Sequence, residues 1–396
     1  MTPSHQDKAS PPGERLLQLD FLRGIAIIAV MGIHFFTVDT GSTLVWLVEY
    51  PLKHFGREGV TLFFTLSGFL VGGLLLREYA GTGTIDARRF IVRRMFKIWP
   101  AYYALILFHV VIGRHPRDTF LVQNTFHLQN YLGSSIAQTW SLAVEEHFYL
   151  LLPLALLGVA RARPSPQTLL VLLAALCTLV LAGRLAAVAA GDLEGAYVYT
   201  HYRVDSLLYG VMLAVVYWLM PATYRALAAR RTWLVAGVAL LLAWLLCLQR
   251  TVALQEGIGF TVQSIGFCAL IVLVLEHSGR LRETLAYRSV AWIGVYSYGI
   301  YLWHTVAREP GRIVIRTALE WGWPPLLIWA LATVLQFAIA IVAGYVTTRL
   351  VEFPFLRLRE TVMPARRSAL PAEGMATDRN DPRRIGPSPR QQGVVD

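Results

Sequence analysis

The chain has 396 residues, of which 55% are hydrophobic and only 15% are charged, and its mean hydropathy is +0.50. This balance excludes an ordinary soluble domain and is typical of a protein that crosses a membrane several times. The formal net charge of +11 is compatible with nucleic-acid binding, but membrane proteins carry Lys and Arg in their cytoplasmic loops for topological reasons. We therefore expect membrane lipids, and no nucleic acid, as partners.

Ten hydrophobic segments predict an all-α, polytopic fold with about ten transmembrane helices. The segments are 16–38, 59–76, 98–113, 142–160, 167–190, 204–220, 232–249, 258–275, 290–306 and 324–349. They indicate one transmembrane domain over 16–360. Residues 1–15 and 361–396 are polar and lack apolar periodicity, so we expect disordered tails. The first segment has spanning length and no cleavage signature, which predicts a retained helix.

The distribution of basic residues predicts the orientation of the chain. With the N-terminus inside, 17 Lys and Arg residues fall on the cytoplasmic side and 10 on the external side, the C-terminal tail being left out. Cytoplasmic loops are enriched in Lys and Arg. We therefore expect both termini in the cytoplasm and a multi-pass protein of the cell (inner) membrane.

Two ionisable residues share the first segment, Arg23 and His34, with ten apolar or Gly residues between them. Eleven helical steps place them within about 20° of one face, at depths that differ by about 16 Å. An ionisable group inside a membrane is costly unless it meets a partner or water, so the pair predicts a polar track through the helix bundle. The alternative is that Arg23 reaches the headgroups and His34 is a core residue.

A basic stretch precedes the third segment, with six Lys and Arg residues between 77 and 99. Its Arg93 and Arg94 could grip a phosphate through paired hydrogen bonds. This pattern predicts an anionic cytosolic ligand. The alternative is a loop that only sets the topology and binds anionic headgroups.

Acidic residues open the fourth segment, on the external side in this topology. Glu145 and Glu146 are costly at membrane depth unless they line a cavity. The alternative, an interfacial charge hydrated by water, stays open for Glu146. Glu145 could orient His34 and stabilise its imidazolium, an arrangement that general-base catalysis uses. In the sixth segment, Arg203 and Asp205 could neutralise each other.

Five motifs, in order along the chain, resemble the membrane acyltransferase-3 family. They are Arg23-x10-His34, Gly59-Val-Thr-Leu-Phe-Phe-Thr-Leu-Ser67-Gly68-Phe69-Leu, Arg93-Arg94-x-x-Lys97-Ile-x-Pro100-x-Tyr102, Thr139-Trp140-Ser-Leu-x-x-Glu145-x-x-Phe-Tyr149 and Tyr301-Leu-Trp-His304. The resemblance implies an integral enzyme that moves an acyl group, usually acetyl, from cytoplasmic acyl-CoA to a hydroxyl. The acceptor it implies is a carbohydrate, on a cell-surface glycan or a glycosylated small molecule.

The resemblance also implies a functional core and shows departures from the family pattern. In the family, the residues that match Arg23, His34, Arg93, Arg94 and Glu145 form this core. The chain has Thr61 where Asp is common, Lys97 where Arg is usual, and Phe353 where a basic residue often follows the Glu. It resembles the stand-alone form, without a fused esterase-like domain.

On this interpretation, His34 and Glu145 are the catalytic residues, Arg23, Arg93 and Arg94 bind acyl-CoA, and no metal is required. An alternative enzymatic route passes through an acyl-enzyme on Ser67, although no base is evident beside it. The alternative from another class is a transporter or flippase that uses Arg, His and Glu as a relay. The lack of an inverted repeat in the sequence argues against transport.

Overall fold

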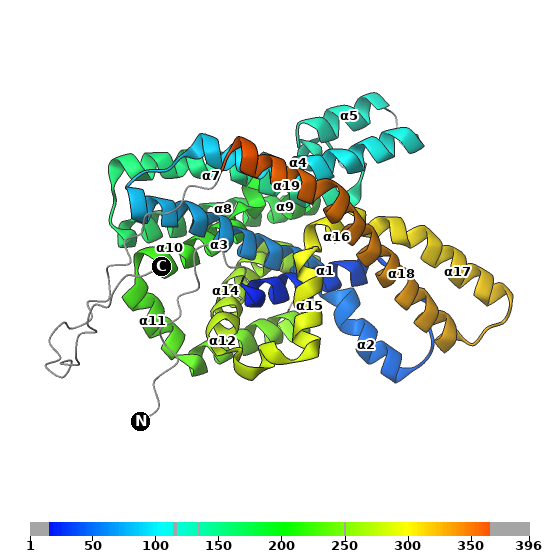
Figure 1. Cartoon of the computed structure of the whole chain (residues 1–396). Helices are drawn as coiled ribbons and strands as arrows, with labels where there is room; N and C mark the ends of the chain where they lie inside the picture. The colour runs from blue at the N-terminus through cyan, green and yellow to red at the C-terminus, as the bar shows by residue number, and fades with distance from the viewer. Residues whose placement is uncertain (1–15, 114–116, 134, 249–250, 365–396) are drawn as a thin grey trace, which may run out of the picture.

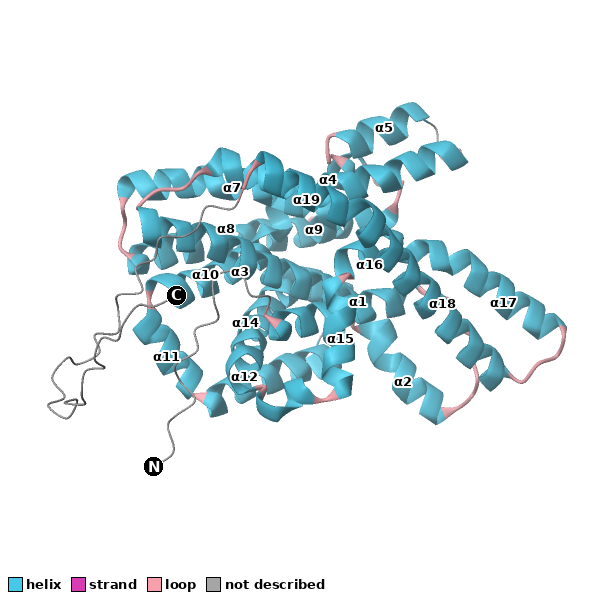
Figure 2. Cartoon of the chain, viewed as in Figure 1, coloured by secondary structure: helices cyan, strands magenta, loops and turns pink. Residues whose placement is uncertain are grey.

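The computed structural model describes residues 16–113, 117–133, 135–248 and 251–364, and in this part of the chain every regular element is a helix (Figure 2). The prediction of an all-α fold is confirmed. The predicted tail 1–15, and all but the first four residues of the predicted tail 361–396, lie outside the described residues.

Eight helical segments within the described ranges are long and apolar enough to cross a membrane. They are α1 (Leu17–His34), α3 (Gly56–Thr82), α4 (Ala87–Ile112), η1 with α7 (Ala137–Thr139, Trp140–Ala162), α8 (Pro166–Ala189), α9 with α10 (Leu193–Val198, Thr200–Leu219), α13, η3 and α14 (Val252–Leu254, Gln255–Gly259, Phe260–His277), and α18, η6 and α19 (Pro325–Thr347, Thr348–Glu352, Phe353–Val362). A ninth candidate is a pair bent by 75°, α11 (Pro221–Ala229) followed by α12 and η2 (Arg231–Ala243, Trp244–Leu248). The chain is therefore a polytopic membrane protein.

One predicted span is broken in the structure. Segment 290–306 is divided among α15 (Leu285–Val295), α16 (Ser297–Trp303) and η5 (His304–Ala307), with the break at Tyr296. Each piece is much shorter than the roughly 20 residues that a membrane helix needs. The run of Tyr, Ser, Tyr and Gly at 296–299 interrupts the apolar pattern at this place. The structure thus offers eight or nine spans in its described part, where the sequence suggested about ten.

The remaining short helices lie between the spans. They are α2 (Thr43–His54), α5 (Arg117–Thr125), α6 (Gln129–Leu132), η4 (Gly279–Glu283) and α17 (Arg308–Glu320). Figure 1 shows α2, α17 and the first part of α18 projecting together from one side of the bundle. Because α2 follows α1 and α17 follows η5, this projection begins at the end of α1 that carries His34.

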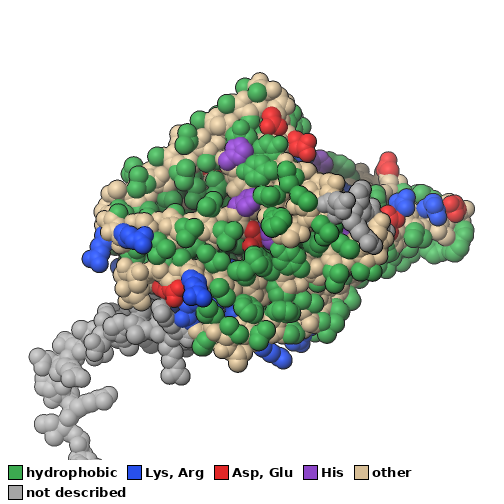
Figure 3. All heavy atoms as spheres, turned by 90° about the horizontal axis from the view of Figure 1, so that it is seen from above, with side chains coloured by type: hydrophobic (Ala, Val, Ile, Leu, Met, Phe, Trp, Pro, Cys, Tyr) green, Lys and Arg blue, Asp and Glu red, His purple; other side chains and the backbone are tan. Residues whose placement is uncertain are grey.

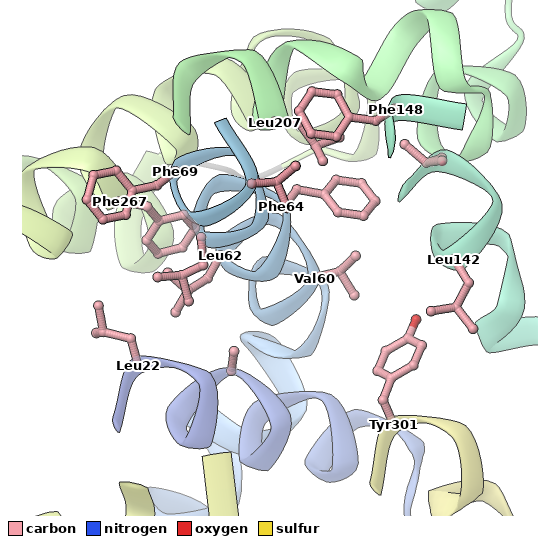
Figure 4. Packing of buried hydrophobic residues seen from close by; sticks show 14 of the residues in the cluster. Leu22, Val60, Leu62, Phe64, Phe69, Leu142, Phe148, Leu207, Phe267 and Tyr301 are labelled. Carbon is pink, nitrogen blue, oxygen red and sulfur yellow. The ribbon is translucent and has the colours of Figure 1, made fainter. Parts of the chain in front are cut away.

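The centre of the bundle is formed by α1, α3 and α10, whose apolar side chains meet those of α7 and α14 (Figure 4). Glycines bring α3 and α10 into backbone contact: a Cβ on Gly68 would lie 1.8 Å from the Leu207 carbonyl oxygen, and one on Gly210 would lie 2.1 Å from that of Thr65. Small residues at helix crossings are typical of membrane bundles, because they allow close packing.

The outer surface also fits a membrane protein. In the face shown in Figure 3, hydrophobic side chains are spread over most of the area, and Lys and Arg gather toward the edges. Largely exposed apolar side chains such as Val111 and Leu172 would be costly in water but are stable against lipid tails.

Candidate active site

A cavity of about 500 Å³ lies inside the bundle, a size that suits a small-molecule ligand. Its lining combines basic and acidic side chains with hydroxyl groups. The charged members are Asp20, Arg23, Arg77, Arg94, Lys97, Glu145 and Glu352. The cavity is also lined by Tyr217 near the C-terminal end of α10, Leu275 near the C-terminal end of α14, and Leu356 of α19. In the orientation predicted from the basic residues, these ends are cytoplasmic.

Three predicted site residues meet in this cavity. The carboxylate of Glu145 interacts electrostatically with Arg23 and Arg94, and the hydroxyl groups of Tyr149 and Ser67 lie beside it. The two hydroxyl groups are themselves 2.5 Å apart, and the Arg94 guanidinium lies 5.5 Å from the Tyr149 ring centroid. Elements distant in sequence, α1, α3, α4 and α7, thus bring two guanidinium groups and one carboxylate together.

The depth of Glu145 differs from the sequence-based expectation. Its neighbour Glu146 accepts a hydrogen bond of 3.0 Å from Trp99 Nε1, and Trp99 lies about 18 Å along α4 from the start of that helix at Ala87. Therefore α7 begins within the bundle and not at its outer mouth. This start places Glu145 with Arg23 and Arg94 instead of with His34.

Arg93 and Arg94 point in different directions, as neighbours on a helix must. Arg94 lines the cavity, whereas Arg93 forms an ion pair of 2.8 Å with Glu360 on α19 and donates a hydrogen bond to the carbonyl of Met363. The structure therefore brings Arg94 to the cavity and Arg93 to the C-terminal end of α19.

His34 lies at the C-terminal end of α1, outside the cavity lining, and is half-buried. Its Nδ1 is 2.8 Å from the carbonyl oxygen of Val30. Because a carbonyl oxygen only accepts, Nδ1 must carry the hydrogen, and the lone pair of the neutral ring is on Nε2. This tautomer leaves Nε2 able to take a proton from a ligand.

A second histidine stands beside His34. The ring centroids of His34 and His304 are 4.8 Å apart, and His304 Nδ1 lies 2.7 Å from the Tyr301 carbonyl oxygen. His304 is fully buried, and its Nε2 has no hydrogen-bond partner among the described residues. Tyr301 lines the cavity, and Figure 4 shows its hydroxyl pointing toward Leu142 of α7. His304 and Tyr301 thus connect His34 to the cavity.

The sequence interpretation assigned no role to His304, although the motif Tyr301-Leu-Trp-His304 contained the signal. It also missed Gln336, a fully buried residue of α18. Gln336 accepts a hydrogen bond of 3.0 Å from the Phe36 N–H and donates one of 2.8 Å to the Phe36 carbonyl. This pair holds the backbone two residues after His34. Its partners are 300 positions apart, so no local pattern could have indicated it.

The buried charges of the sixth predicted segment are arranged differently from the expectation. Asp205 forms its ion pair with Arg184 of α8 at 2.9 Å, and both side chains are fully buried. Arg203 instead stacks on Phe260, with its guanidinium 3.3 Å from the ring centroid. Asp205 and Arg203 point to opposite sides of α10 because they are two residues apart. Asp205 thus neutralises Arg184. No role was predicted for Arg184 from the sequence, because it is a single charge within the long apolar segment 167–190.

Comparisons with known proteins show what the sequence is similar to. A family model for the acyltransferase domain of the acyltransferase-3 family matches residues 16–345. The chain is 29% identical over 316 residues to YrhL of Bacillus subtilis, a protein named as a candidate peptidoglycan O-acetyltransferase, with 72% of this chain and 47% of the relative covered. It is 28% identical over 365 residues to the peptidoglycan O-acetyltransferase OatA of Listeria monocytogenes (85% and 55% covered).

A third relative, the O-acetyltransferase OatA of Staphylococcus aureus, is 24% identical over 367 residues, with 85% of this chain and 56% of the relative covered. The chain thus spans about half the length of the curated relatives it matches. No solved structure matches the chain significantly. The family match covers most of the sequence and all of the cavity lining except Glu352, Phe353 and Leu356. The chain therefore belongs to the acyltransferase-3 family.

Proposed function

We propose that this protein is an O-acyltransferase of the cell membrane that moves an acetyl group from cytoplasmic acetyl-CoA to a hydroxyl of a cell-surface glycan. The observation that carries the proposal is the cavity in which Arg23 and Arg94 flank Glu145. Tyr301 and His304 connect this cavity to His34. Family membership supports acyl transfer, and the names of the relatives support acetyl as the group and peptidoglycan as the class of acceptor.

The cationic side chains of the cavity are suited to the donor. Arg23, Arg77, Arg94 and Lys97 supply positive charge at its lining, and arginine in particular binds phosphate through paired hydrogen bonds. Glu145 would hold Arg23 and Arg94 in position through its charge, a role different from the one the sequence suggested for it. The phosphates of acetyl-CoA would bind near the cytoplasmic end, with the thin pantetheine arm directed inward.

His34 would act as the general base. As the acceptor hydroxyl oxygen attacks the thioester carbonyl carbon, its proton passes to His34 Nε2, the C–S bond breaks, and CoA leaves as a thiolate. The thiolate takes up a proton from water, and His34 returns its proton to water, which restores the neutral base and leaves no net hydroxide. The last turn of α1 favours a positive charge on His34, because the carbonyl end of a helix dipole is negative. Arg23 and His34 are separated by about 16 Å along α1, which suits a long donor arm.

The proposal is tested with the purified full-length chain in liposomes. We expect release of the CoA thiol that depends on an added saccharide, together with acetate on that saccharide by mass spectrometry. An Arg94→Gln variant should raise the KM for acetyl-CoA by roughly tenfold or more, because a charge-assisted contact to phosphate is lost. Arg225→Gln, on α11 and outside the cavity, is the matched control. Uptake of a solute without thiol release would support a transporter and sink the proposal.

A further inference from the structure

Most basic residues of α3 and α17 near the His34 end of the bundle have an acidic partner. Arg57 pairs with Glu256 at 3.1 Å, Arg312 with Glu309 at 2.8 Å, and Arg316 with Glu320 at 3.8 Å. Such pairing is the usual condition of charges near an apolar surface, where an uncompensated charge is costly. Two cations in the same region depart from this rule.

Lys53, in the last turn of α2, and Arg308, the first residue of α17, form no ion pair within the described residues. Lys53 donates a hydrogen bond to the Phe35 carbonyl. Arg308 lies over the Phe36 ring, 4.9 Å from its centroid, and its buried Nε has no hydrogen-bond partner in the described part of the chain. Both cations therefore contact the two residues that directly follow His34.

One oxygen of the nearby carboxylate, Glu49 Oε1, is engaged elsewhere. Glu49 accepts a hydrogen bond of 2.6 Å from Trp329 Nε1 and another from Thr37. Burial lowers the pKa of Lys53; Glu49 opposes this effect, and the charge on Arg308 adds to it. The half-buried cations Lys53 and Arg308 thus repel each other, and Glu49 compensates their charge only in part. Binding of an anion between them would relieve this repulsion.

Both cations also act on His34, with which they interact electrostatically. A positive charge beside a base opposes the arrival of a proton on that base. An anionic group placed between Lys53 and Arg308 would cancel this opposition at the moment when His34 takes the acceptor proton. Binding of an anion and proton transfer would therefore support each other.

We propose that Lys53 and Arg308 form an acceptor subsite for an anionic group, a carboxylate or a phosphate carried by the glycan, next to the hydroxyl that His34 deprotonates. The subsite deepens the proposed function and rests on it. The guanidinium of Arg308 offers a planar donor pair and the ammonium of Lys53 a mobile point charge, a combination that binds either anion. A subsite of this kind would select an acidic saccharide as the acceptor.

The test compares two probes that differ only in charge: the disaccharide N-acetylglucosaminyl-N-acetylmuramic acid, and the same sugar with its carboxylate converted to an amide. Both are assayed with acetyl-CoA and the full chain in phosphatidylcholine liposomes, for binding and for transfer. We expect wild type to prefer the acid by about tenfold in kcat/KM, from a charge-assisted contact. Lys53→Gln and Arg308→Gln should remove this preference by weakening use of the acid only.

Two further variants control for structural effects. Arg312→Gln, one turn further along α17 and paired with Glu309, should keep the preference. Lys53→Arg should also keep it, because the charge and the donor to Phe35 remain. Equal binding of the acid and the amide to wild type overturns the subsite, whether or not transfer occurs. If the subsite exists but the proposed function is wrong, the result differs: wild type binds the acid selectively and acetylates neither probe.

An anionic lipid headgroup is the other source of the same chemistry. Adding phosphatidylglycerol to the liposomes distinguishes the sources. If phosphatidylglycerol speeds transfer to the amide in wild type but not in Arg308→Gln, and the acid has no advantage, the occupant is a headgroup and the acceptor subsite is wrong. If the advantage of the acid persists in both lipids, the inference stands.

Discussion

At the scale of single residues, two histidines with the same tautomer define the candidate reaction centre. In His34 and His304 alike, Nδ1 is tied to a backbone carbonyl, and Nε2 is left with its lone pair. The half-buried ring of His34 is accessible to a ligand, whereas His304 is fully buried behind it. Under the proposed function, we therefore propose that His34 transfers the proton and that His304 positions His34.

This assignment predicts the behaviour of His304→Gln. The variant should lower kcat by about tenfold or more, because a general base contributes on the order of a hundredfold or more and depends on its orientation. The KM for acetyl-CoA should be unchanged, and the pH dependence of kcat should shift as the environment of His34 changes. His277→Gln is the matched control, since His277 bonds the Ala228 carbonyl away from the site. A change in KM with an unaltered pH profile would mean that His304 is only structural.

Gln336 provides a second prediction. Gln336→Glu keeps the acceptor for the Phe36 N–H but sets a carboxylate oxygen against the Phe36 carbonyl, with which the amide now forms a bond of 2.8 Å. We expect a loss of stability of about 1–3 kcal/mol, the usual cost of an unsatisfied buried group, and a lower kcat at unchanged donor KM. Thermal unfolding and steady-state kinetics measure the two effects. Wild-type turnover in this variant would show that the two hydrogen bonds between Gln336 and Phe36 do not position His34.

The adjacent arginines of α4 provide a third prediction. Arg94→Gln should raise the KM for acetyl-CoA more than Arg93→Gln does, because Arg94 lines the cavity and Arg93 pairs with Glu360. A Glu360→Gln variant, which releases Arg93, should behave like Arg93→Gln. Titration of the purified variants with acetyl-CoA decides this point. Equal effects of Arg93 and Arg94 would indicate that α19 moves away from α4 when the donor binds.

At the scale of elements, the crossing of α3 with α10 fixes the bundle through backbone contact. Gly68→Ala and Gly210→Ala would each place a methyl group about 2 Å from a carbonyl oxygen, so a helix must move. We expect destabilisation of at least about 1–3 kcal/mol, the range for overpacking. Gly158→Ala is the control, because no atom lies within 4 Å of its added Cβ. A melting temperature for Gly68→Ala equal to that of Gly158→Ala would contradict the crossing.

The elements also show what a sequence can and cannot predict. The span of α1, with Arg23 and His34 at two depths, was predictable because one apolar run and a helical period are local properties. The break at Tyr296 had a local signal in the run at 296–299, but the apolar residues on both sides favoured one continuous span. The deep start of α7 was not predictable, because it depends on contacts with other helices. The ion pair of Asp205 with Arg184 and the hydrogen bonds of Gln336 with Phe36 were not predictable either, because each joins residues of different helices or segments.

At the scale of the whole molecule, the cavity that we propose for the donor and the proposed base His34 lie toward opposite ends of α1. Arg23 is in the first half of this helix and His34 at its last residue, and the cavity is lined by elements whose ends the basic residues assign to the cytoplasm. Such a layout predicts transfer across the membrane: acetyl-CoA enters from one side, and the acceptor hydroxyl is acetylated from the other. A transporter of acetyl-CoA would instead deliver the intact thioester.

The most direct test encloses the muramic-acid disaccharide inside sealed proteoliposomes and supplies acetyl-CoA, labelled in its acetyl group, only outside. We predict that wild type places the label on the enclosed saccharide while CoA stays outside, and that His34→Ala, although still able to bind acetyl-CoA, places almost none there. Transfer at the wild-type rate by folded His34→Ala, or transfer only when donor and acceptor share one compartment, would contradict the account.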